Sequence, residues 1–160
     1  MLESDFEGLY TVAKDPLVWQ QHPEPLRYQK ENFRKYFDSG LASRGGLIVE
    51  SSQTGDMIGS SRYYDFSGVK REVCIGYTFL AREYWGGSWN RELKHLMLSH
   101  AFQFVETVLF HVDSENFRSQ KALEKIGARW INQIERPNSQ GELRKAFTYG
   151  LQKFEFSGLV

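Results

Sequence analysis

One stretch, "VCIGYTFLAREYWGGSWNRELKHLM" at residues 73–97, constrains the fold most strongly, because its character changes twice. It begins as an apolar run typical of a buried strand, passes through Gly86, Gly87 and Ser88, and continues with the spacing of a helix. Backbone N–H groups at a helix N-terminus are unpaired donors, and the helix dipole adds partial positive charge there. The order strand, small-residue loop and helix therefore predicts a phosphate-binding loop, to which Arg91 adds a cation.

Taken alone, this loop does not identify a ligand. It lacks the Gly-Lys-Ser/Thr ending of a Walker A motif, and it is not the GxGxxG of a parallel dinucleotide-binding repeat. An ordinary glycine turn between a strand and a helix is the simpler interpretation when no other part of the chain is considered.

Length and charge limit the classes of protein that the chain can belong to. At 160 residues, with 41% hydrophobic and 15% aromatic content, the chain suits one globular domain, which we predict over residues 1–160. Twenty basic and twenty acidic side chains give zero formal net charge. No broad basic field is implied, so we expect no nucleic-acid partner.

Cysteine usage and hydropathy exclude further classes. Cys74 is the only cysteine, which excludes an intrachain disulfide and leaves no Cys-rich zinc site, so we expect no metal. The N-terminal residues do not resemble a signal peptide, and no apolar run approaches membrane-spanning length. We therefore expect a cytoplasmic protein without a membrane partner.

The remaining pattern predicts a mixed arrangement of helices and strands. Ser4 is expected to cap the first helix, and Gly76 suggests a bulge or a close ligand approach within its strand. The expected helices cover residues 4–13, 27–41, 89–105 and 116–126, and the expected strands cover 46–51, 56–66, 71–80, 107–112, 128–135 and 144–156. In the helix after the glycine loop, we expect one buried stripe made of Leu93, Leu96, Met97, His100, Ala101, Phe104 and Val105.

A second motif, "VLFHVDSENFRSQKALEKIGARW", combines a strand, a helix start and another strand. Asn116 is a natural N-cap, and Ser119 falls near the third helical position. Gly127 is placed to end the helix as a C-cap glycine. Capping alone would explain the residue types at these positions.

Together, the two motifs resemble those of the GNAT N-acetyltransferases, which transfer acetyl from acetyl-CoA to an amine. The chain is most similar to the branch that contains the ribosomal-protein N-terminal acetyltransferases, from Asp5 to Phe156. The resemblance implies an α/β (α+β) domain with a mixed central sheet of about six strands flanked by helices. Relatives usually begin with a strand before the first helix, and we expect this first edge strand to be missing here.

The resemblance also implies a set of residues that bind acetyl-CoA as co-substrate. The diphosphate loop of the family falls on residues 85–90, where Trp85, Ser88 and Asn90 depart from the usual pattern. The backbone of residues 78–80 would hold the pantetheine arm, and an N–H near Tyr77 or Thr78 would polarise the thioester carbonyl. The implied cofactor-binding residues are Thr78, Phe79, Leu80, Trp85, Gly86, Gly87, Ser88, Trp89, Asn90, Arg91, Asn116 and Ser119.

Three residues are candidates for catalysis. The resemblance places Ser119 near the thioester sulfur, whereas Leu123 stands where many relatives carry a tyrosine that protonates the leaving thiolate. The amine must lose a proton, and Glu72 and His111 are candidates for the base. A histidine on a strand is more often a structural core residue.

The leading hypothesis is an N-acetyltransferase in which a primary amine, on a protein N-terminus or a small molecule, attacks the thioester directly. A non-catalytic acyl-CoA-binding module of the same fold is the first alternative, and a phosphate-binding protein outside this family is the second. The resemblance allows a homodimer. Aromatic residues that could line an acceptor pocket, but that we mostly expect in the core, are Trp19, His22, Tyr28, Tyr63, Tyr64 and Trp130.

Overall fold

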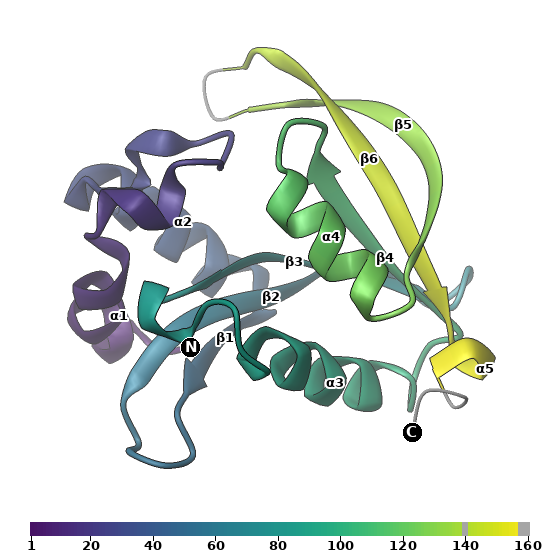
Figure 1. Cartoon of the computed structure of the whole chain (residues 1–160), viewed down its shortest axis with the longest axis horizontal. Coiled ribbons are helices and arrows are strands. Elements are labelled where there is room, and N and C mark those ends of the chain that lie inside the picture. The colour runs from purple at the N-terminus through teal and green to yellow at the C-terminus, as the bar shows by residue number, and fades with distance from the viewer. Residues whose placement is uncertain (139–140, 157–160) are drawn as a thin grey trace. The chain divides into compact units, whose positions relative to one another are not determined.

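The computed structural model describes residues 1–138 and 141–156 (Figure 1). Its helices are α1 Phe6–Ala13, α2 Lys30–Ser43, α3 Trp89–Ala101, α4 Phe117–Lys125 and α5 Lys153–Phe156. Its strands are β1 Gly46–Glu50, β2 Met57–Ser67, β3 Glu72–Leu80, β4 Thr107–Asp113, β5 Arg129–Pro137 and β6 Leu143–Gln152. Short 3-10 helices are η1 Glu3–Asp5, η2 Pro16–Trp19, η3 Pro25–Tyr28 and η4 Arg82–Tyr84.

The strands form a mixed sheet of six strands in the order β1-β2-β3-β4-β6-β5. β3 and β4 run parallel, whereas β1 with β2, β4 with β6, and β5 with β6 are antiparallel. The predicted fold class is confirmed, and β3 lies inside the sheet between β2 and β4. Within the described residues, no strand precedes η1, as we predicted.

The chain divides into two compact units, and each is described by itself. The first unit contains Met1–Tyr63 and Gly76–Gly87, and the second contains Tyr64–Ile75 and the residues from Ser88 onward. The assignment of residues 1–160 to one domain stays a prediction. In the part of the chain that the structure describes, no helix combines the length and apolarity needed to cross a bilayer.

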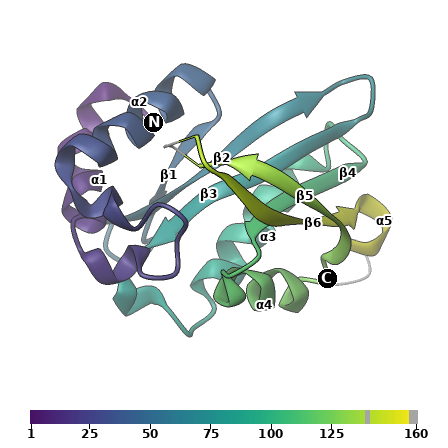
Figure 2. The ribbon, with the colours of Figure 1, turned by 90° about the horizontal axis from the view of Figure 1, so that it is seen from above.

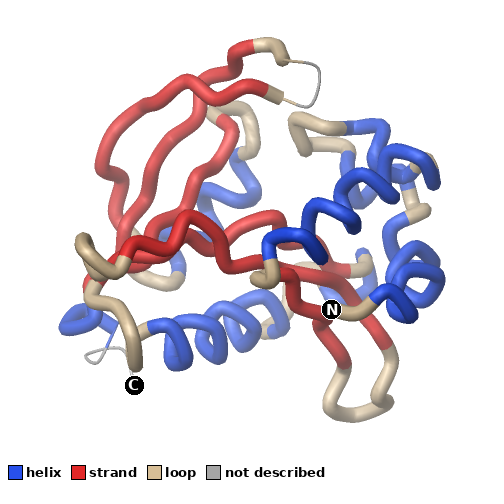
Figure 3. Tube along the Cα trace, turned by 180° about the vertical axis from the view of Figure 1, so that it is seen from behind, coloured by secondary structure: helices blue, strands red, loops and turns tan. Residues whose placement is uncertain are grey.

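In the first unit, two of the expected strands form a hairpin, and two helices are present. β1 and β2 pair antiparallel, with Leu47 opposite Ser61, and residues 51–56 form the turn between them (Figure 3). Backbone bonds from Gly55 to Ser51 and from Ser51 to Asp56 close this turn, at 2.8 and 2.9 Å. α1 and α2 lie side by side and contact each other (Figure 2).

An aromatic cluster forms the core of this unit. Trp19 is 1% exposed and its indole N–H donates to the carbonyl of Ala13 at 2.7 Å, so its polar atom is satisfied. The buried members of the cluster are Phe6, Leu9, Ala13, Val18, Trp19, Phe33, Tyr36, Phe37 and Phe79. Truncation of one such aromatic side chain costs about 3–5 kcal/mol of stability, so this cluster fixes α1 and α2 on the strand segments of the unit.

Two predicted helix starts need correction. α2 begins at Lys30 rather than at residue 27, because Pro25 starts a 3-10 turn and Gln29 is extended, with φ −75° and ψ 132°. α1 follows η1 directly, and Asp5 rather than Ser4 precedes it. The Asp5 carboxylate accepts a bond from the Leu2 amide instead of capping α1.

In the second unit, β6 pairs antiparallel with both β4 and β5. β5 and β6, both expected as strands, pair as a hairpin, and Ser139 and Gln140 of its connection lie outside the described residues. The predicted strand to residue 156 is wrong beyond Gln152, because the chain turns into α5. The Lys153 amide bonds the Glu106 carbonyl at 2.9 Å and so leaves the strand ladder.

The buried face of α3 differs from the predicted stripe. Leu96 is 69% exposed, Phe104 lies beyond the helix and is 62% exposed, and His100 is exposed. The helix instead buries Lys94, Met97, Leu98 and Ala101, which also have helical spacing. Two overlapping faces of α3 have the spacing of a buried helix face, and the structure buries the one that contains Lys94.

Candidate functional site

The glycine loop joins the end of β3 to α3 in an open conformation. Gly86 has a left-handed φ of +77°, and no heavy atom lies within 4 Å of the place where a Cβ would stand. The Trp85 indole N–H donates to the Leu80 carbonyl at 2.9 Å, which ties the loop to the end of the strand. The tryptophan at the first position of the loop motif therefore has a structural role.

The N-terminus of α3 is not capped by its own side chains. Ser88 stands at the N-cap, but its hydroxyl donates to the Glu92 carboxylate instead of accepting from the helix. Among the described residues, no backbone acceptor pairs with the amides of Gly86, Gly87, Ser88, Asn90 and Arg91, and the first ladder bond is from the Glu92 amide to Ser88, at 2.9 Å. Orphan amides of this kind, at the positive end of a helix dipole, are suited to an anion.

Strand β3 contains a conformational irregularity one residue after the predicted one. Tyr77, rather than Gly76, has the unusual backbone, with φ +53°. A bulky residue in this region is strained by about 1–3 kcal/mol and persists only where its surroundings fix it. Next to it, the Thr78 hydroxyl lies 2.7 Å from that of Ser61 on β2, which fixes the side chain of Thr78.

Tyr36 and Arg62 hold the strained residue in place, and sequence reasoning did not single out either one. The Tyr36 hydroxyl donates to the Tyr77 carbonyl at 2.7 Å, and the Arg62 guanidinium lies 4.2 Å from the centre of the Tyr77 ring. Arg62 also donates to the Tyr36 carbonyl at 3.0 Å. Burial raises the pKa of Tyr36, which keeps its hydroxyl protonated as a donor.

The start of α4 has the predicted geometry. The Asn116 side chain accepts a bond from the Ser119 amide at 3.1 Å, which confirms Asn116 as the N-cap. Asn116 is 8% exposed, and within the described residues no acceptor bonds its Nδ2. Gly127 ends the helix with φ +82°, as predicted.

A family comparison gives these features a common context. The sequence model of the family described as "Acetyltransferase (GNAT) domain" matches residues 1–129. The chain belongs to the GNAT acetyltransferases. No curated protein sequence matches it significantly.

Solved structures share the fold of this GNAT acetyltransferase. A candidate acetyltransferase from T. thermophilus is 26% identical, with a TM-score of 0.80 over 99% of this chain and 86% of that one. A GCN5-related N-acetyltransferase from Brucella melitensis is 15% identical, with a TM-score of 0.83 over 96% and 73%. Spermidine N-acetyltransferase from Vibrio cholerae, in complex with CoA and spermine, is 14% identical, with a TM-score of 0.73 over 98% and 95%.

The predicted site residues of this GNAT acetyltransferase fall in both units. Thr78, Phe79 and Leu80 lie on β3 in the first unit, with Trp85, Gly86 and Gly87 after them. The second unit contains Ser88, Trp89, Asn90, Arg91, Asn116 and Ser119. Their assignment to acetyl-CoA stays a prediction.

The two candidates for the base do not lie together. Glu72 stands opposite Thr107 in the register of β3 and β4, and His111 follows four residues later on β4. Four strand residues span about 13 Å. Glu72 faces Lys70 at 3.5 Å, whereas the Arg136 guanidinium lies 2.7 Å from Nδ1 of His111.

The surroundings of His111 fix its protonation state. Because arginine only donates, Nδ1 of His111 must accept, so the proton of the neutral ring is on Nε2. The Tyr64 hydroxyl is 3.0 Å from the same nitrogen. Burial and then the charge of Arg136 lower the pKa of His111. The lone pair that a general base needs is therefore already engaged.

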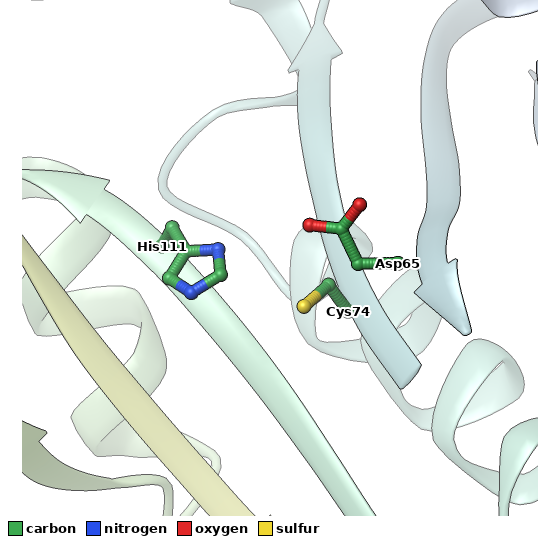
Figure 4. Close-up of side chains that lie close together, drawn as sticks. All are labelled: Asp65, Cys74 and His111. Carbon is green, nitrogen blue, oxygen red and sulfur yellow. The ribbon is translucent and has the colours of Figure 1, made fainter. Parts of the chain in front are cut away.

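His111 also belongs to a cluster with Asp65 and Cys74, one side chain from each of three neighbouring strands (Figure 4). One ligand atom from each lies within 4.8 Å of the others. Burial, and then the charge of Asp65, raise the pKa of the Cys74 thiol to about 11, so it stays protonated. A cation would require loss of that proton and displacement of Arg136, so the donor set does not suit a metal.

The aromatic residues considered for an acceptor pocket divide by exposure. Trp19 is buried in the core, whereas Trp130 on β5 is 56% exposed and is not a core residue. Burial raises the pKa of Tyr63 to about 12. His22 lies beside Trp19, with ring centroids 5.4 Å apart in an edge contact. Cys74 is 3% exposed and is a core residue.

Proposed function

We propose that this protein transfers the acetyl group of acetyl-CoA to a primary amine by direct attack of the amine on the thioester. The observation that carries the proposal is the uncapped start of α3, where backbone amides around Gly87 have no acceptor within the described residues. An anionic diphosphate is the ligand that such a helix start favours. Membership of the GNAT acetyltransferases supports the same donor.

In this proposal, each part of the donor has its own binding group. The diphosphate binds the amides of Gly86, Gly87 and Ser88, and the exposed Arg91 adds positive charge. The pantetheine arm bonds the backbone of residues 78–80 and Nδ2 of Asn116. Acetyl-CoA supplies the activated acetyl group when it is bound.

The reaction requires one bond to form and one to break. The amine nitrogen attacks the carbonyl carbon, and the oxygen becomes negative. A backbone N–H near the left-handed Tyr77 or at Thr78 stabilises that oxyanion, a contribution of about 3–4 kcal/mol in other enzymes. The C–S bond then breaks, and the thiolate takes a proton near Ser119. Leu123, which is 5% exposed, has no proton to give.

The amine proton is proposed to pass to water. Glu72 and His111 were predicted as bases, but Glu72 faces Lys70 and the lone pair of His111 faces Arg136. Their contacts favour structural roles. A rate that survives Glu72→Gln and His111→Gln supports transfer to water, and a loss of about 100-fold or more in either variant contradicts it.

The proposal also covers the location, the oligomeric state and the acceptor of the enzyme. We also propose that the enzyme belongs to the ribosomal-protein branch, is cytoplasmic and can form a homodimer. The amine can be a protein N-terminus or a small molecule, and a solved neighbour is a spermidine N-acetyltransferase in complex with CoA and spermine.

Two measurements test the proposed function. Calorimetry should show acetyl-CoA binding, and release of free CoA thiol should accelerate when a panel of amines is added. Binding without transfer to any amine would favour the non-catalytic acyl-CoA-binding module. Absence of acetyl-CoA binding would contradict both functions.

A further inference from the structure

The first unit contains a cluster of two arginines and two tyrosines beside the strained strand residue. The guanidinium carbons of Arg27 and Arg62 lie 4.9 and 5.4 Å from the centre of the same Tyr36 ring. Tyr36 itself bonds the Tyr77 carbonyl. The cluster therefore adjoins the segment that the proposed function assigns to the thioester.

Neither arginine is neutralised by a carboxylate. Among the residues that the structure describes, no Asp or Glu oxygen lies within ion-pair distance of Arg27 or Arg62. Arginines that do pair with carboxylates there are Arg34, Arg71, Arg82, Arg129 and Arg144. Two unpaired cations over one aromatic ring form a local positive site in a chain whose formal net charge is zero.

The two arginines differ in how their donors are used. Arg62 is 4% exposed and donates to the Ser39 hydroxyl at 2.9 Å and to the Tyr36 carbonyl at 3.0 Å, so it is part of the framework. Arg27 is half-buried on η3, and within the described residues its guanidinium has one hydrogen-bonding neighbour, Nε2 of His22, at 3.1 Å. A guanidinium has five N–H donors in a planar fork.

His22 cannot fully satisfy Arg27. The amide of Glu24 lies 3.0 Å from Nδ1 of the same ring, and a neutral imidazole has one acceptor nitrogen. The Glu24 amide and the Arg27 guanidinium therefore compete for the one acceptor nitrogen of His22. Burial has the largest influence on the pKa of Arg27 and lowers it; the charge of Glu24 acts in the opposite direction, and the charge of Arg62 lowers it further.

We propose that Arg27 binds a carboxylate of the acceptor, so that the acetylated amine is an aminocarboxylate, as in a free amino acid. This inference rests on the proposed function and assigns its acceptor class. The planar fork of Arg27 matches a carboxylate in a bidentate geometry. Trp19 and Tyr36 hold the guanidinium between aromatic surfaces, 5.6 and 4.9 Å from their ring centres. A polyamine would place further positive charge beside both arginines.

The test compares acids with their amides in the unmodified chain. Amino acids and the corresponding amino acid amides carry the same amine, and only the acid has the carboxylate. With acetyl-CoA as donor, we expect kcat/KM for the acid to exceed that for the amide by about 10–100-fold, and spermidine to be a poor acceptor. Equal rates for acid and amide, or a preference for spermidine, would overturn the assignment of Arg27.

A pair of variants tests whether Arg27 causes the preference for the acid over the amide. Arg27→Gln should raise KM for the acid by about 10–100-fold, remove the preference over the amide and leave KM for acetyl-CoA unchanged. Arg34→Gln is the matched control, because Arg34 also lies over aromatic rings, 4.7 Å from Phe6, but pairs with Asp38. If Arg27→Gln keeps the preference, another residue binds the carboxylate and the inference fails.

Calorimetry with an N-acetylated amino acid and its amide gives a readout that needs no turnover. The acid should bind the unmodified chain and the Arg34→Gln variant, and should bind Arg27→Gln at least about tenfold more weakly. Equal affinity for acid and amide would contradict the carboxylate site. If no amine in the panel is acetylated although acetyl-CoA binds, the proposed function fails, a result that differs from equal transfer to acids and amides.

Discussion

The starts of α3 and α4 show two solutions to the same problem. At α4, Asn116 accepts from the amide of Ser119, so the chain satisfies its own helix terminus. At α3, the Ser88 hydroxyl donates to Glu92, and the preceding glycine amides are left without acceptors in the described structure. An unsatisfied terminus lowers helix stability, and the proposed diphosphate would supply the missing acceptors at the start of α3.

The two helices also differ in the polarity of the residues that they bury. α4 buries Leu123, an ordinary apolar anchor, whereas α3 buries Lys94, which is 6% exposed. Burial lowers the pKa of Lys94 from its ordinary 10.5 to about 7. α3 therefore differs from α4 both at its N-terminus and in its buried face.

Replacement of Lys94 should have the largest effect on stability. The folded pKa lies below the unfolded one, so the unfolded chain binds more protons between pH 7 and 10.5, and stability should rise with pH across this window. Lys94→Met should raise the free energy of unfolding by on the order of 2 kcal/mol at pH 7, and it should reduce the increase in stability between pH 7 and 10.5. Denaturant unfolding at several pH values measures both, with the exposed Lys125→Met as control. An unchanged pH slope would contradict the cost assigned to Lys94.

Replacement of Gly86 should have the largest effect on ligand affinity. Gly86→Val adds a side chain where the backbone must approach the diphosphate, so Kd for acetyl-CoA should rise at least tenfold, or about 1.4 kcal/mol. Gly55→Val is the matched control, because Gly55 has the same φ of +77° and the same open surroundings in another loop. Both variants should lose about 1–2 kcal/mol of stability from left-handed strain. Equal acetyl-CoA affinity in the two variants would exclude the loop as the binding site.

Two replacements of Asn116 separate its cap from its proposed ligand contact. Asn116→Ala should cost about 1 kcal/mol of stability, because the Ser119 amide loses its acceptor. Asn116→Asp keeps the cap oxygen and removes Nδ2, so stability should be retained while Kd for acetyl-CoA rises. Thermal unfolding and calorimetry distinguish the two effects. Full acetyl-CoA affinity in Asn116→Asp would assign Asn116 to the cap alone.

The smallest expected change concerns Glu92. Its carboxylate holds the Ser88 hydroxyl and places negative charge in the first turn of α3, where the diphosphate is proposed to bind. Glu92→Gln should tighten acetyl-CoA binding about threefold, because a like charge is removed, and should cost about 0.5 kcal/mol of stability without ligand. Calorimetry measures the change in acetyl-CoA affinity, and denaturant unfolding of the same samples measures the change in stability. Weaker binding would mean that Glu92 supports the ligand.

Local signals made most of the fold predictable. The N-cap Asn116 and the C-cap glycine Gly127 depend on residues close in sequence, and the structure has them as predicted. The buried face of α3 was predicted incorrectly because two faces share Met97 and Ala101. A pattern based on polarity excludes Lys94, whereas tertiary packing can bury its aliphatic stem.

The residues around the strained strand were less predictable. Arg27, Tyr36 and Arg62 come from η3, α2 and β2, so no spacing along the sequence brings them together. Gly76 indicated an irregularity in β3, but the strain is at Tyr77, because the bonds of Tyr36 and Arg62 fix that residue. Long-range contacts of this kind cannot be predicted from spacing along the sequence and require the folded structure.

Amide resonances provide the most direct test of the central claim. The chain, labelled with ¹⁵N, is titrated with acetyl-CoA and, in parallel, with S-acetylpantetheine, which lacks the diphosphate. The account predicts that acetyl-CoA shifts the amide signals of Gly86, Gly87 and Ser88, while S-acetylpantetheine leaves them in place. If acetyl-CoA binds and these three signals do not move, the start of α3 does not hold the diphosphate and the account is contradicted.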